Sequence, residues 1–399
     1  MGEPDREKNR DFIQAIPVEG DFVRRYLEWA SKMTDAPCEF LVAGALACMS
    51  VAVGRRVVLN NRIYANLWLV LMGDSSVFRK STSIALARTL CEQAGLDVFP
   101  DRITPESFYE TLAREPQGLF ALSELGGWLG AMSRSYAAGL KQDMTELYDC
   151  PAEFRRIRKG PRNKIVEFKV RHPYIVLLSA STLEWFQQHV QEDDSAGGFL
   201  PRFQFVLGRG REPYPIPPRL EIPAELLEQL RRISETTGNI LLDQSTKGPY
   251  EVYSAWFYQF REKLQEYPVE LIPYAVRLET LALKLAVLFE ADAKPGQYLE
   301  QLSPASIAKG CSYAEYFLES ARKVIERLSF TSFERLCRKV EDVIAKMPGA
   351  TQRDILRSVC VPKQNLDEAL MYLQQSGRIH GHAVKPEGRG RPTIRYYPA

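Results

Sequence analysis

A lysine and its neighbouring hydroxyl residues follow an apolar segment at almost the spacing that phosphate binding requires. Residues 67–72 read LWLVLM, as in a buried strand, and GDSSVFRKST follows at 73–82. The usual phosphate-binding pattern is Gly-x-x-x-x-Gly-Lys-[Ser/Thr]. Here Gly73 lies seven residues before Lys80, which is one too many, and Arg79 replaces the second glycine. The loop is therefore either a working variant or a chance resemblance.

A phosphate loop needs a strand that delivers it, backbone N–H groups that face the anion, and a helix that starts there. The strand, the first glycine, the lysine and an alanine-rich helix start are all present. The sequence therefore predicts that the loop binds ATP and that the Ser81 hydroxyl binds Mg²⁺. The predicted ligands of ATP in the loop are Gly73, Ser75, Ser76, Arg79, Lys80, Ser81 and Thr82. The alternative is a serine-rich turn that caps a helix, with Ser81 or Thr82 near the N-cap.

An acidic residue ends a second apolar strand, GLFALS, at 118–123. Ser123 and Glu124 follow its apolar residues and precede a Gly-Gly turn. A neighbouring strand that ends in acidic residues is part of the ATP site of P-loop proteins. We therefore predict that Glu124 is the base that orients the attacking water. Ser123 stands where an aspartate is usual and is predicted to lie at the metal. The alternative is an exposed strand-end glutamate, which is common.

Hydroxyl residues end a third strand, YIVLLSAS, at 174–181. Ser179 and Ser181 lie at its carboxyl end, and Thr182 follows. Open α/β sheets place their chemistry at the carboxyl ends of the strands, so a residue here is predicted to position water near the γ-phosphate. Equally, these residues are typical N-caps of the helical segment TLEWFQQHV that follows.

Two arginines complete the set of candidates. Arg202 lies in GGFLPRFQFV, between a glycine-rich turn and an apolar strand, and Arg277 lies in the helical segment YAVRLETLALKLA. An arginine that reaches a neighbour's γ-phosphate stabilises the charge of the transition state, which is the role predicted for Arg202. Its alternative is a surface arginine. For Arg277 the alternative is a solvated helix face shared with Lys284, seven residues on.

The elements that must position these residues alternate in type along the chain. Residues 1–62 are mostly helical in pattern, and 63–215 alternate apolar strands with helices, which is typical of an α/β layer with a parallel sheet. A proline-rich segment at 212–223 ends this layer. Residues 216–330 have mostly the periodicity of helices, and 331–399 form a distinct tail. Strands are predicted at 67–72, 118–123, 174–181 and 204–208.

Composition restricts the class of protein. The chain has 399 residues and a net charge of +2, so its overall charge implies no partner. Its seven cysteines are scattered and it has four histidines, which argues against a zinc site or a disulfide scaffold and favours a reducing cytoplasm. The polar start is not typical of a signal peptide. The apolar stretch from Phe40 to Val53 is too short to span a bilayer, so we expect a buried helix there and no membrane partner.

A strongly basic stretch, FRRIRKGPRNKIVEFKVR, lies at 154–171 between the Glu124 strand and the Ser179 strand. Its centre is a turn signal between two β-patterned arms, which predicts a hairpin with a positive tip. Lysine and arginine neutralise phosphates without reading sequence, so DNA is the predicted partner. The predicted contacts are Arg158, Lys159, Arg162 and Lys164. The alternative is a solvated charged hairpin.

The tail has the pattern of three amphipathic helices followed by two strands around a basic, glycine-rich connection. This order resembles that of winged helix-turn-helix domains. The resemblance implies that the third helix lies in the groove of duplex DNA and that the basic connection lies on phosphates. The basic residues of this part are Lys385, Arg389, Arg391 and Arg395. Such domains also bind proteins, which is the alternative.

Taken in order, the phosphate loop, the Ser-Glu strand end, the Ser-Ala-Ser-Thr strand end, GGFLPRF and VRLETLALKLA resemble the motifs of AAA+ ATPases. The likeness covers roughly residues 35–295. It is greatest to a P-loop family of phage, plasmid and integrated-element replication proteins that are often found near primases. The last two motifs are similar to the arginine finger and sensor-2 helix of minichromosome-maintenance helicases. The resemblance implies that Ser179 or Ser181 is sensor 1, Arg202 is the arginine finger that acts between subunits, and Arg277 is sensor 2. In ring helicases of this class a hairpin also enters the pore, where single-stranded DNA passes.

The sequence thus predicts an α/β protein with an AAA+ P-loop core at 63–215, helical N-terminal (1–62) and lid (216–330) regions, and a winged helix-turn-helix domain at 331–399. It predicts a DNA helicase or translocase that uses ATP and Mg²⁺, forms a homo-oligomeric ring, such as a homo-hexamer, and acts in replication of a mobile element, with a primase as a candidate partner. One alternative is an ATP-switched DNA-binding or helicase-loader protein that does not unwind DNA. Another is a degenerate P-loop scaffold that binds DNA.

Overall fold

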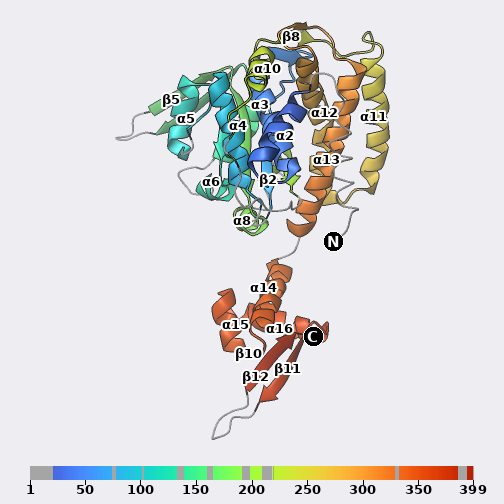
Figure 1. The fold of residues 1–399 in the computed structure, drawn as a ribbon. Helices are drawn as coiled ribbons and strands as arrows, with labels where there is room; N and C mark the ends of the chain where they lie inside the picture. The colour runs from blue at the N-terminus through green and yellow to red at the C-terminus, as the bar shows by residue number, and fades with distance from the viewer. Residues whose placement is uncertain are drawn as a thin grey trace. The chain divides into compact units, whose positions relative to one another are not determined.

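The computed structural model describes residues 21–73, 78–100, 103–132, 139–159, 165–190, 198–208, 218, 220–328, 332–384 and 393–398. The chain divides into two compact units, Met1–Ile325 and Glu326–Ala399 (Figure 1). All five tryptophans lie in the first unit, and the second unit has a hydrophobic core of its own.

A four-stranded parallel sheet forms the centre of the first unit. Its strands are β2 (Trp68–Met72), β3 (Gln117–Leu122), β6 (Tyr174–Ser181) and β7 (Gln204–Leu207), in the order β3-β6-β2-β7. Every residue of β2 and β6 is buried, as expected for strands that are covered on both faces. The four predicted strands and the predicted α/β class with a parallel sheet are therefore confirmed.

Helix α3 (Cys38–Val53) is apolar on all sides and buried along almost its whole length. All its residues except Cys38 are buried. A helix that is hydrophobic all round is typical of a core position, so the prediction of a buried helix is confirmed. No helix in the described ranges is long and apolar enough to cross a membrane. The helices packed against α3 are α2 (Phe22–Met33), α4 (Lys80–Ala94), α10 (Ala224–Ser234) and α12 (Ile272–Ala293).

A second sheet, of three short parallel strands, joins distant parts of the first unit. It consists of β1 (Val57–Leu59), β8 (Thr237–Ile240) and β9 (Tyr298–Leu299), in the order β1-β8-β9. The strands β8 and β9 fall in the range that the sequence predicts to be mostly helical. These two strands were not predicted, because β8 has a single large apolar residue and β9 has two residues in all, so neither shows a periodic pattern.

The remaining elements of the first unit surround the central sheet. Strands β4 (Glu153–Lys159) and β5 (Ile165–Arg171) pair antiparallel, which confirms the predicted hairpin. In Figure 1, α11, α12 and α13 lie together on one side of the unit, and α5 lies with the hairpin on the other. The helices not yet placed are α5 (Pro105–Arg114), α6 (Leu125–Met132), α7 (Leu140–Tyr148), α8 (Leu183–His189), α11 (Pro249–Lys263) and α13 (Pro304–Leu328), with short turns η3 (Leu200–Arg202), η4 (Leu264–Glu266) and η5 (Val269–Leu271).

The second unit combines three helices with a small antiparallel sheet. Its elements are α14 (Ser332–Lys346), β10 (Ala350–Thr351), α15 (Gln352–Val359), α16 (Lys363–Gln375), β11 (Ile379–Val384) and β12 (Thr393–Pro398). The strands pair in the order β10-β12-β11. Side chains of all three helices form the core, among them Val340, Ile355 and Leu366. The three predicted helices and two predicted strands are present, and β10 was not predicted.

A buried carboxylate ties three helices of the first unit together. Asp292, near the end of α12, accepts hydrogen bonds from the backbone N–H of Phe22 at the start of α2 (2.9 Å) and from Nε2 of Gln229 on α10 (2.8 Å). Burial disfavours the charged form and raises the pKa of Asp292 to about 7, although both hydrogen bonds oppose the shift. The carboxyl group of the folded protein therefore titrates near neutral pH.

We predict that Asp292 makes the first unit less stable as the pH rises from about 4, the usual pKa of an aspartate, to about 7. Within this window the folded protein holds a proton that the unfolded chain has released. The free energy of unfolding therefore falls with pH, by at most ~1.4 kcal/mol per pH unit, and the fall ends above the folded pKa. Asp292→Asn should remove this dependence of the free energy of unfolding on pH, even if the substitution also changes that free energy by the same amount at every pH.

Denaturant unfolding at several pH values, followed by tryptophan fluorescence, measures this slope for the first unit alone. Asp97→Asn removes an exposed carboxylate from the same unit and serves as the control. An equal slope in the wild-type and Asp292→Asn proteins would show that Asp292 does not titrate in this window.

Candidate functional site

Three of the predicted motifs meet at the carboxyl edge of the central sheet. Strand β6 lies between β2 and β3, so the strand ends that carry Gly73, Ser181 and Glu124 are adjacent. The Gly73 N–H donates to the Ser181 carbonyl oxygen (3.4 Å), and the Ser181 hydroxyl donates to Glu124 Oε1 (3.0 Å). The structure thus brings Gly73 of the predicted phosphate loop, the predicted base and a predicted sensor residue together at the edge where open α/β sheets bind their ligands.

The described part of the phosphate loop runs directly into helix α4. Lys80 is the first residue of the helix, and its ammonium group donates a hydrogen bond to the Gly73 carbonyl oxygen at the other end of the loop. The lysine predicted to bind phosphates therefore lies across the loop. Ser75 and Ser76 lie outside the described residues, and their predicted contacts stay predictions.

Arg79 occupies a backbone conformation that a glycine adopts more readily. Its φ of 49° and ψ of 35° are left-handed, and it is the N-cap of α4. This conformation costs a residue with a side chain roughly 1–2 kcal/mol. The side chain turns to the connection between α2 and α3, where its Nε lies 3.1 Å from a carboxylate oxygen of Asp35. The arginine thus takes the backbone position of the missing glycine, and the ion pair holds it there.

The first turn of α4 carries two exposed hydroxyl groups. Ser81 and Thr82 lie within this turn and neither is the N-cap, because Arg79 holds that position. The alternative, in which Ser81 or Thr82 lies near the N-cap of a helix, is compatible with this position, although neither residue is the N-cap itself. The first N–H groups of a helix have no partner within the helix, so this turn offers donors to an anion.

Aromatic rings pack closely around both ends of the loop. Phe40 and Phe78 lie edge to face with ring centres 6.4 Å apart. A Cβ atom at Gly73 would lie 3.0 Å from the Phe78 ring, and one at Gly208, just after β7, would lie 2.7 Å from Phe40. A side chain at Gly208 would therefore force its neighbours to shift, and one at Gly73 would press on the Phe78 ring.

Glu124 is exposed directly after β3, yet its carboxylate has defined partners. Its Oε1 accepts the backbone N–H of Gly126 at 2.9 Å as well as the Ser181 hydroxyl. Ser123, beside it, is also exposed. The described ranges contain no group of three His, Cys, Asp or Glu side chains arranged for a metal. Carboxylate and hydroxyl oxygens are nevertheless the ligand type that Mg²⁺ takes, so Glu124, Ser123 and Ser81 fit this ion chemically.

The three hydroxyl residues at the end of β6 differ in their surroundings. Thr182 is the N-cap of α8 and accepts the N–H of Trp185 at 3.1 Å, so the capping alternative is confirmed for this residue. The Ser179 hydroxyl is buried and has no hydrogen-bond partner among the described atoms. Ser181 contacts Glu124, which makes it the hydroxyl that the geometry links to the predicted base.

A second group of charges lies at the opposite, amino-terminal edge of the sheet. Arg202 ends η3, just before β7, and is 5% exposed. Its Nη1 donates to the Gly198 carbonyl oxygen (2.6 Å), and its Nη2 pairs with Asp149 (2.9 Å). Its Nε has no partner in the described part of the chain. The alternative of a surface arginine is therefore wrong.

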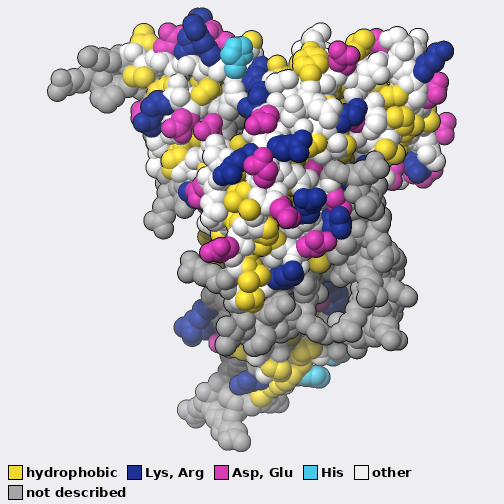
Figure 2. All heavy atoms as spheres, turned by 45° about the horizontal axis from the view of Figure 1, so that its top comes forward, with side chains coloured by type: hydrophobic (Ala, Val, Ile, Leu, Met, Phe, Trp, Pro, Cys, Tyr) yellow, Lys and Arg dark blue, Asp and Glu magenta, His cyan; other side chains and the backbone are white. Residues whose placement is uncertain are grey.

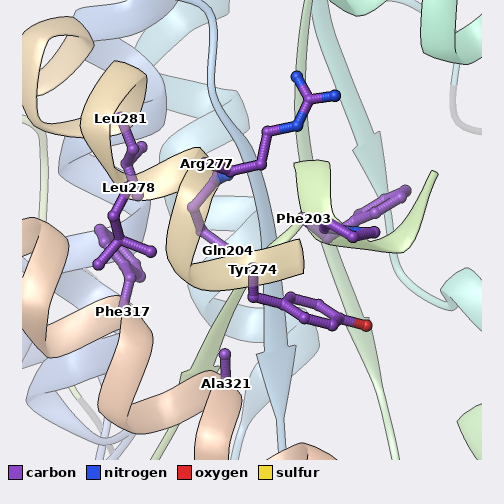
Figure 3. Close-up of a pocket in the computed structure, with 9 residues that line it drawn as sticks. Phe203, Gln204, Tyr274, Arg277, Leu278, Leu281, Phe317 and Ala321 are labelled. Carbon is purple, nitrogen blue, oxygen red and sulfur yellow. The ribbon is translucent and has the colours of Figure 1, made fainter. Parts of the chain in front are cut away.

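Arg277, on α12, lies next to Arg202. A Cβ atom at Gly198 would lie 3.2 Å from Nη1 of Arg202 and 3.7 Å from Nη2 of Arg277. Gly198 also has a φ of 73°, so both the backbone and the space require glycine. Burial, and then the charge of Arg202, lowers the pKa of Arg277. Figure 3 shows the Arg277 side chain leaving α12 away from Leu278 and Phe317. Two guanidinium groups in close approach favour an anion between them.

Lys284 does not share a solvated face with Arg277. It is 4% exposed, and its Nζ donates to the backbone and side-chain oxygens of Asn66 at 3.1 and 2.8 Å. The alternative of a surface pair on α12 is therefore wrong, because this side of the helix is buried. The Lys284 ammonium lies 3.8 Å, and the Arg202 guanidinium 5.6 Å, from the centre of the Tyr148 ring, so one aromatic ring contacts two cations.

The strand register separates these arginines from the phosphate loop of their own chain. Gln204, at the start of β7, pairs with Leu69 near the start of β2. From Leu69 to Gly73 the strand advances ~13 Å, at about 3.3 Å per residue. Arg202 lies further back still, with its guanidinium held by Gly198 and Asp149. The arginine is therefore not placed to reach a nucleotide bound by its own chain.

The β4–β5 hairpin has an apolar inner face and an exposed outer face. On the inner face, Phe154 and Phe168 are buried, with ring centres 6.4 and 5.6 Å from that of Tyr109 on α5. On the outer face, Ile157 and Ile165 are 63% and 75% exposed. The inner face thus fixes the hairpin to the unit, and the outer face is open to a partner.

Basic side chains accompany the two isoleucines on the outer face. Arg155 and Lys169 pair with Glu153 at 2.5 and 2.8 Å, and Arg171 lies 3.9 Å from the same carboxylate. One acid therefore serves three basic residues. On the face of the first unit seen in Figure 2, by contrast, basic and acidic side chains are interspersed. Arg158 and Lys159 lie at the end of β4, but their side chains are not among those described. Arg162 and Lys164 lie wholly outside the described residues.

The second unit exposes little positive charge on its third helix. Leucine and alanine side chains bury one side of α16, whereas Asp367 and Glu368 on the exposed side outnumber its one basic residue, Lys363. DNA phosphates repel such a face, so this geometry does not favour the predicted groove contact. Arg395 on β12 is exposed, and its Nη1 donates to the Gly349 carbonyl oxygen (3.1 Å). The other basic residues predicted to contact DNA here lie outside the described residues: Lys385, Arg389 and Arg391.

Comparison with models of known protein families gives no match, and comparison with curated proteins gives no significant relative. The function of the chain is therefore argued from the arrangement of its own residues.

We predict that Lys80→Ala loses roughly 10- to 150-fold in ATP affinity. A hydrogen bond to a charged group contributes about 1.5–3 kcal/mol, and each 1.4 kcal/mol is tenfold in affinity. Arg79 does not replace the lysine, because it is paired with Asp35. Titration with a fluorescent ATP analogue measures the loss, with the exposed Lys247→Ala as control. Unchanged affinity in Lys80→Ala would rule out the phosphate-loop assignment.

Proposed function

We propose that the chain is an AAA+ ATPase that forms a ring with copies of itself and couples ATP hydrolysis to movement on DNA, as a replicative helicase of a mobile genetic element. The observation that carries the proposal is the contact between the ends of β2, β6 and β3. Gly73 bonds to Ser181, and Ser181 to Glu124, while Lys80 lies across the loop. Three separate sequence motifs thus meet at one edge of the sheet, and this supports a site for the transfer of a phosphoryl group to water.

Each residue at this edge has a role in the proposal. Lys80 and the first N–H groups of α4 bind the phosphates, and Ser81 and Ser123 hold Mg²⁺, which neutralises charge that develops on the phosphates when it is bound. Glu124 orients the attacking water. Both hydrogen bonds that Glu124 accepts use Oε1, so Oε2 is the oxygen available to the water. Ser181 fixes the direction of the carboxylate.

The positions of Arg202 and Arg277 support assembly into a ring. Both lie at the amino-terminal edge of the sheet, whereas the phosphate loop follows its carboxyl edge. In a ring each chain places one edge against its neighbour, because a head-to-tail interface repeats until it closes. The arginines of one copy then act on the nucleotide of the next and stabilise the charge of the transition state.

We predict that Arg202→Ala binds ATP but does not hydrolyse it, and that mixing it with Lys80→Ala protein restores part of the turnover. In a mixed ring one chain supplies the arginine and its neighbour the intact loop, so some sites are complete. Phosphate release from mixtures of constant total concentration measures the rescue. The control mixture combines Lys80→Ala with Glu124→Gln, in which each nucleotide site that keeps Lys80 lacks the base. Mixed rings that show no rescue at any ratio would mean that Arg202 does not act between copies.

The hairpin is the proposed contact with single-stranded DNA. Its outer face carries three basic side chains beside Glu153, a second acid, Glu167, and two exposed isoleucines. Basic side chains bind phosphates without reading sequence. In the second unit, the exposed side of α16 is acidic, so we propose that the β11–β12 connection, and not α16, contacts duplex DNA.

A second candidate function is that of an ATP-switched DNA-binding or loader protein. Ser123 favours it, because a serine supplies no carboxylate beside Glu124 and ATP hydrolysis would be slower.

We predict that replacing Lys159, Arg162 and Lys164 by alanine removes stimulation of ATP turnover by single-stranded DNA and removes unwinding, but leaves turnover without DNA intact. Each lost phosphate contact should also reduce the log–log salt dependence of binding by roughly 0.7. The control, in which Arg232, Lys247 and Lys263 are replaced by alanine, removes the same charge from exposed positions elsewhere in the unit.

Strand displacement on a forked duplex separates the two candidates. A wild-type protein that hydrolyses ATP in response to DNA without displacing a strand is a switch or loader. A triple variant that is stimulated and unwinds like the wild type would remove the hairpin from the DNA path.

A further inference from the structure

We propose that Asp149 holds Arg202 within its own chain until DNA on the β4–β5 hairpin moves the segment that carries Asp149. The inference rests on the proposed function and names the regulation of the same ATPase. In it Asp149 is a positioning residue, because it acts through Arg202 and does not touch the nucleotide.

The pair between Asp149 and Arg202 is unequal in its exposure. The Arg202 side chain is 6% exposed and the Asp149 side chain 58%. Carboxylate and phosphate are both anionic acceptors that a guanidinium group binds through parallel hydrogen bonds. Asp149 therefore occupies a place on Arg202 that a phosphate of a neighbouring copy would take. While this pair is intact, Arg202 is neutralised internally and its Nη2 is not free for the neighbour.

The backbone after Asp149 has the features of a pivot. Cys150 is buried with a left-handed φ of 51°, a conformation that residues with side chains adopt under strain and that is typical of switch segments. Nη1 of Arg55 donates to the carbonyl oxygens of Cys150 (2.8 Å) and Pro151 (3.1 Å). Arg55 thus anchors this short segment between α7 and the start of β4 at Glu153. Nδ2 of Asn66 anchors the end of α7 through the Tyr148 carbonyl oxygen (2.9 Å).

An ion pair joins the hairpin, which follows this segment, to α7, which precedes it. Nη1 of Arg156, on β4, pairs with Oδ1 of Asp143 on α7 at 3.1 Å. The Tyr109 hydroxyl of α5 donates to the other oxygen of the same carboxylate. A displacement of the hairpin tip is therefore passed through Arg156 and Asp143 to α7, and the end of α7 carries Asp149. Such a contiguous chain of contacts between two sites is the physical basis that coupling requires.

Release of Arg202 by DNA has a specific kinetic consequence. Without DNA, Asp149 competes with the neighbour's phosphate and turnover is slow. With DNA on the hairpin, Asp149 withdraws and Arg202 is available. DNA stimulation is thus a measure of how strongly Asp149 restrains the arginine, and removal of the Asp149 charge should give part of the stimulation without DNA.

The test is the ratio of ATP turnover with single-stranded DNA to turnover without it. Asp149→Asn should raise turnover without DNA by about 10-fold and lower the ratio by the same factor, within the 5–150-fold range typical of coupling between sites. Asp149→Glu retains the charge and should retain most of the stimulation. Adding Arg202→Ala to Asp149→Asn should abolish the gain. ATP affinity, measured separately, should equal that of the wild type and shows that the variants are folded.

Glu279→Gln is the matched control. It breaks a pair between Glu279 on α12 and Arg261 on α11 (2.5 Å) and should leave the ratio unchanged. An unchanged ratio in Asp149→Asn, or an equal fall of turnover with and without DNA, would overturn the proposal, since the second result means that Asp149 only keeps Arg202 in place. If wild-type protein does not hydrolyse ATP, the proposed function and this inference both fail. A wild type that DNA stimulates, together with an unchanged ratio in the variant, removes the inference alone.

Discussion

The parallel pairing of β6 with both β2 and β3 is the constraint on which the candidate site depends. Because all three strands run in the same direction, their carboxyl ends lie at one edge. Gly73 therefore forms a hydrogen bond with Ser181, and Ser181 forms one with Glu124. The same direction fixes the opposite edge, where the residues before β7 place Arg202. One topological arrangement thus decides both which residues meet at the carboxyl edge and that the buried Arg202 lies at the opposite edge.

Charge balance at the amino-terminal edge depends on few partners. Arg202, Arg277 and Lys284 bring three positive charges close to Tyr148, and Asp149 is the carboxylate paired with Arg202. The buried ammonium group of Lys284 binds the oxygens of Asn66 and lies against the Tyr148 ring. These contacts offset the cost of removing the charge from water, but they carry no negative charge to neutralise it. The edge is therefore electropositive through its own packing, which suits contact with the phosphates of another molecule.

Local patterns in the sequence were sufficient to predict the four strands of the central sheet and the β4–β5 hairpin, because each depends on residues close together in the chain. They were not sufficient for pairs such as Arg79 with Asp35, which are 44 residues apart and belong to no motif. The alternatives for Arg202 and Lys284 were wrong for a related reason. Most arginines and lysines are exposed, and only the packing of η3 and α12 shows that these two are buried.

The second sheet of the first unit has a consequence for how the protein is made. Val57 in β1 pairs with Gly238 in β8, and β8 in turn pairs with Leu299 in β9. A chain that is synthesised from its amino terminus cannot complete this sheet until most of the polypeptide has left the ribosome. Helix α3 is apolar on every side, and two of the helices that pack against it, α10 and α12, are synthesised much later. Until then the early helices α2 and α4 cover part of α3, and the rest of its apolar surface lacks the partners that it has in the folded protein.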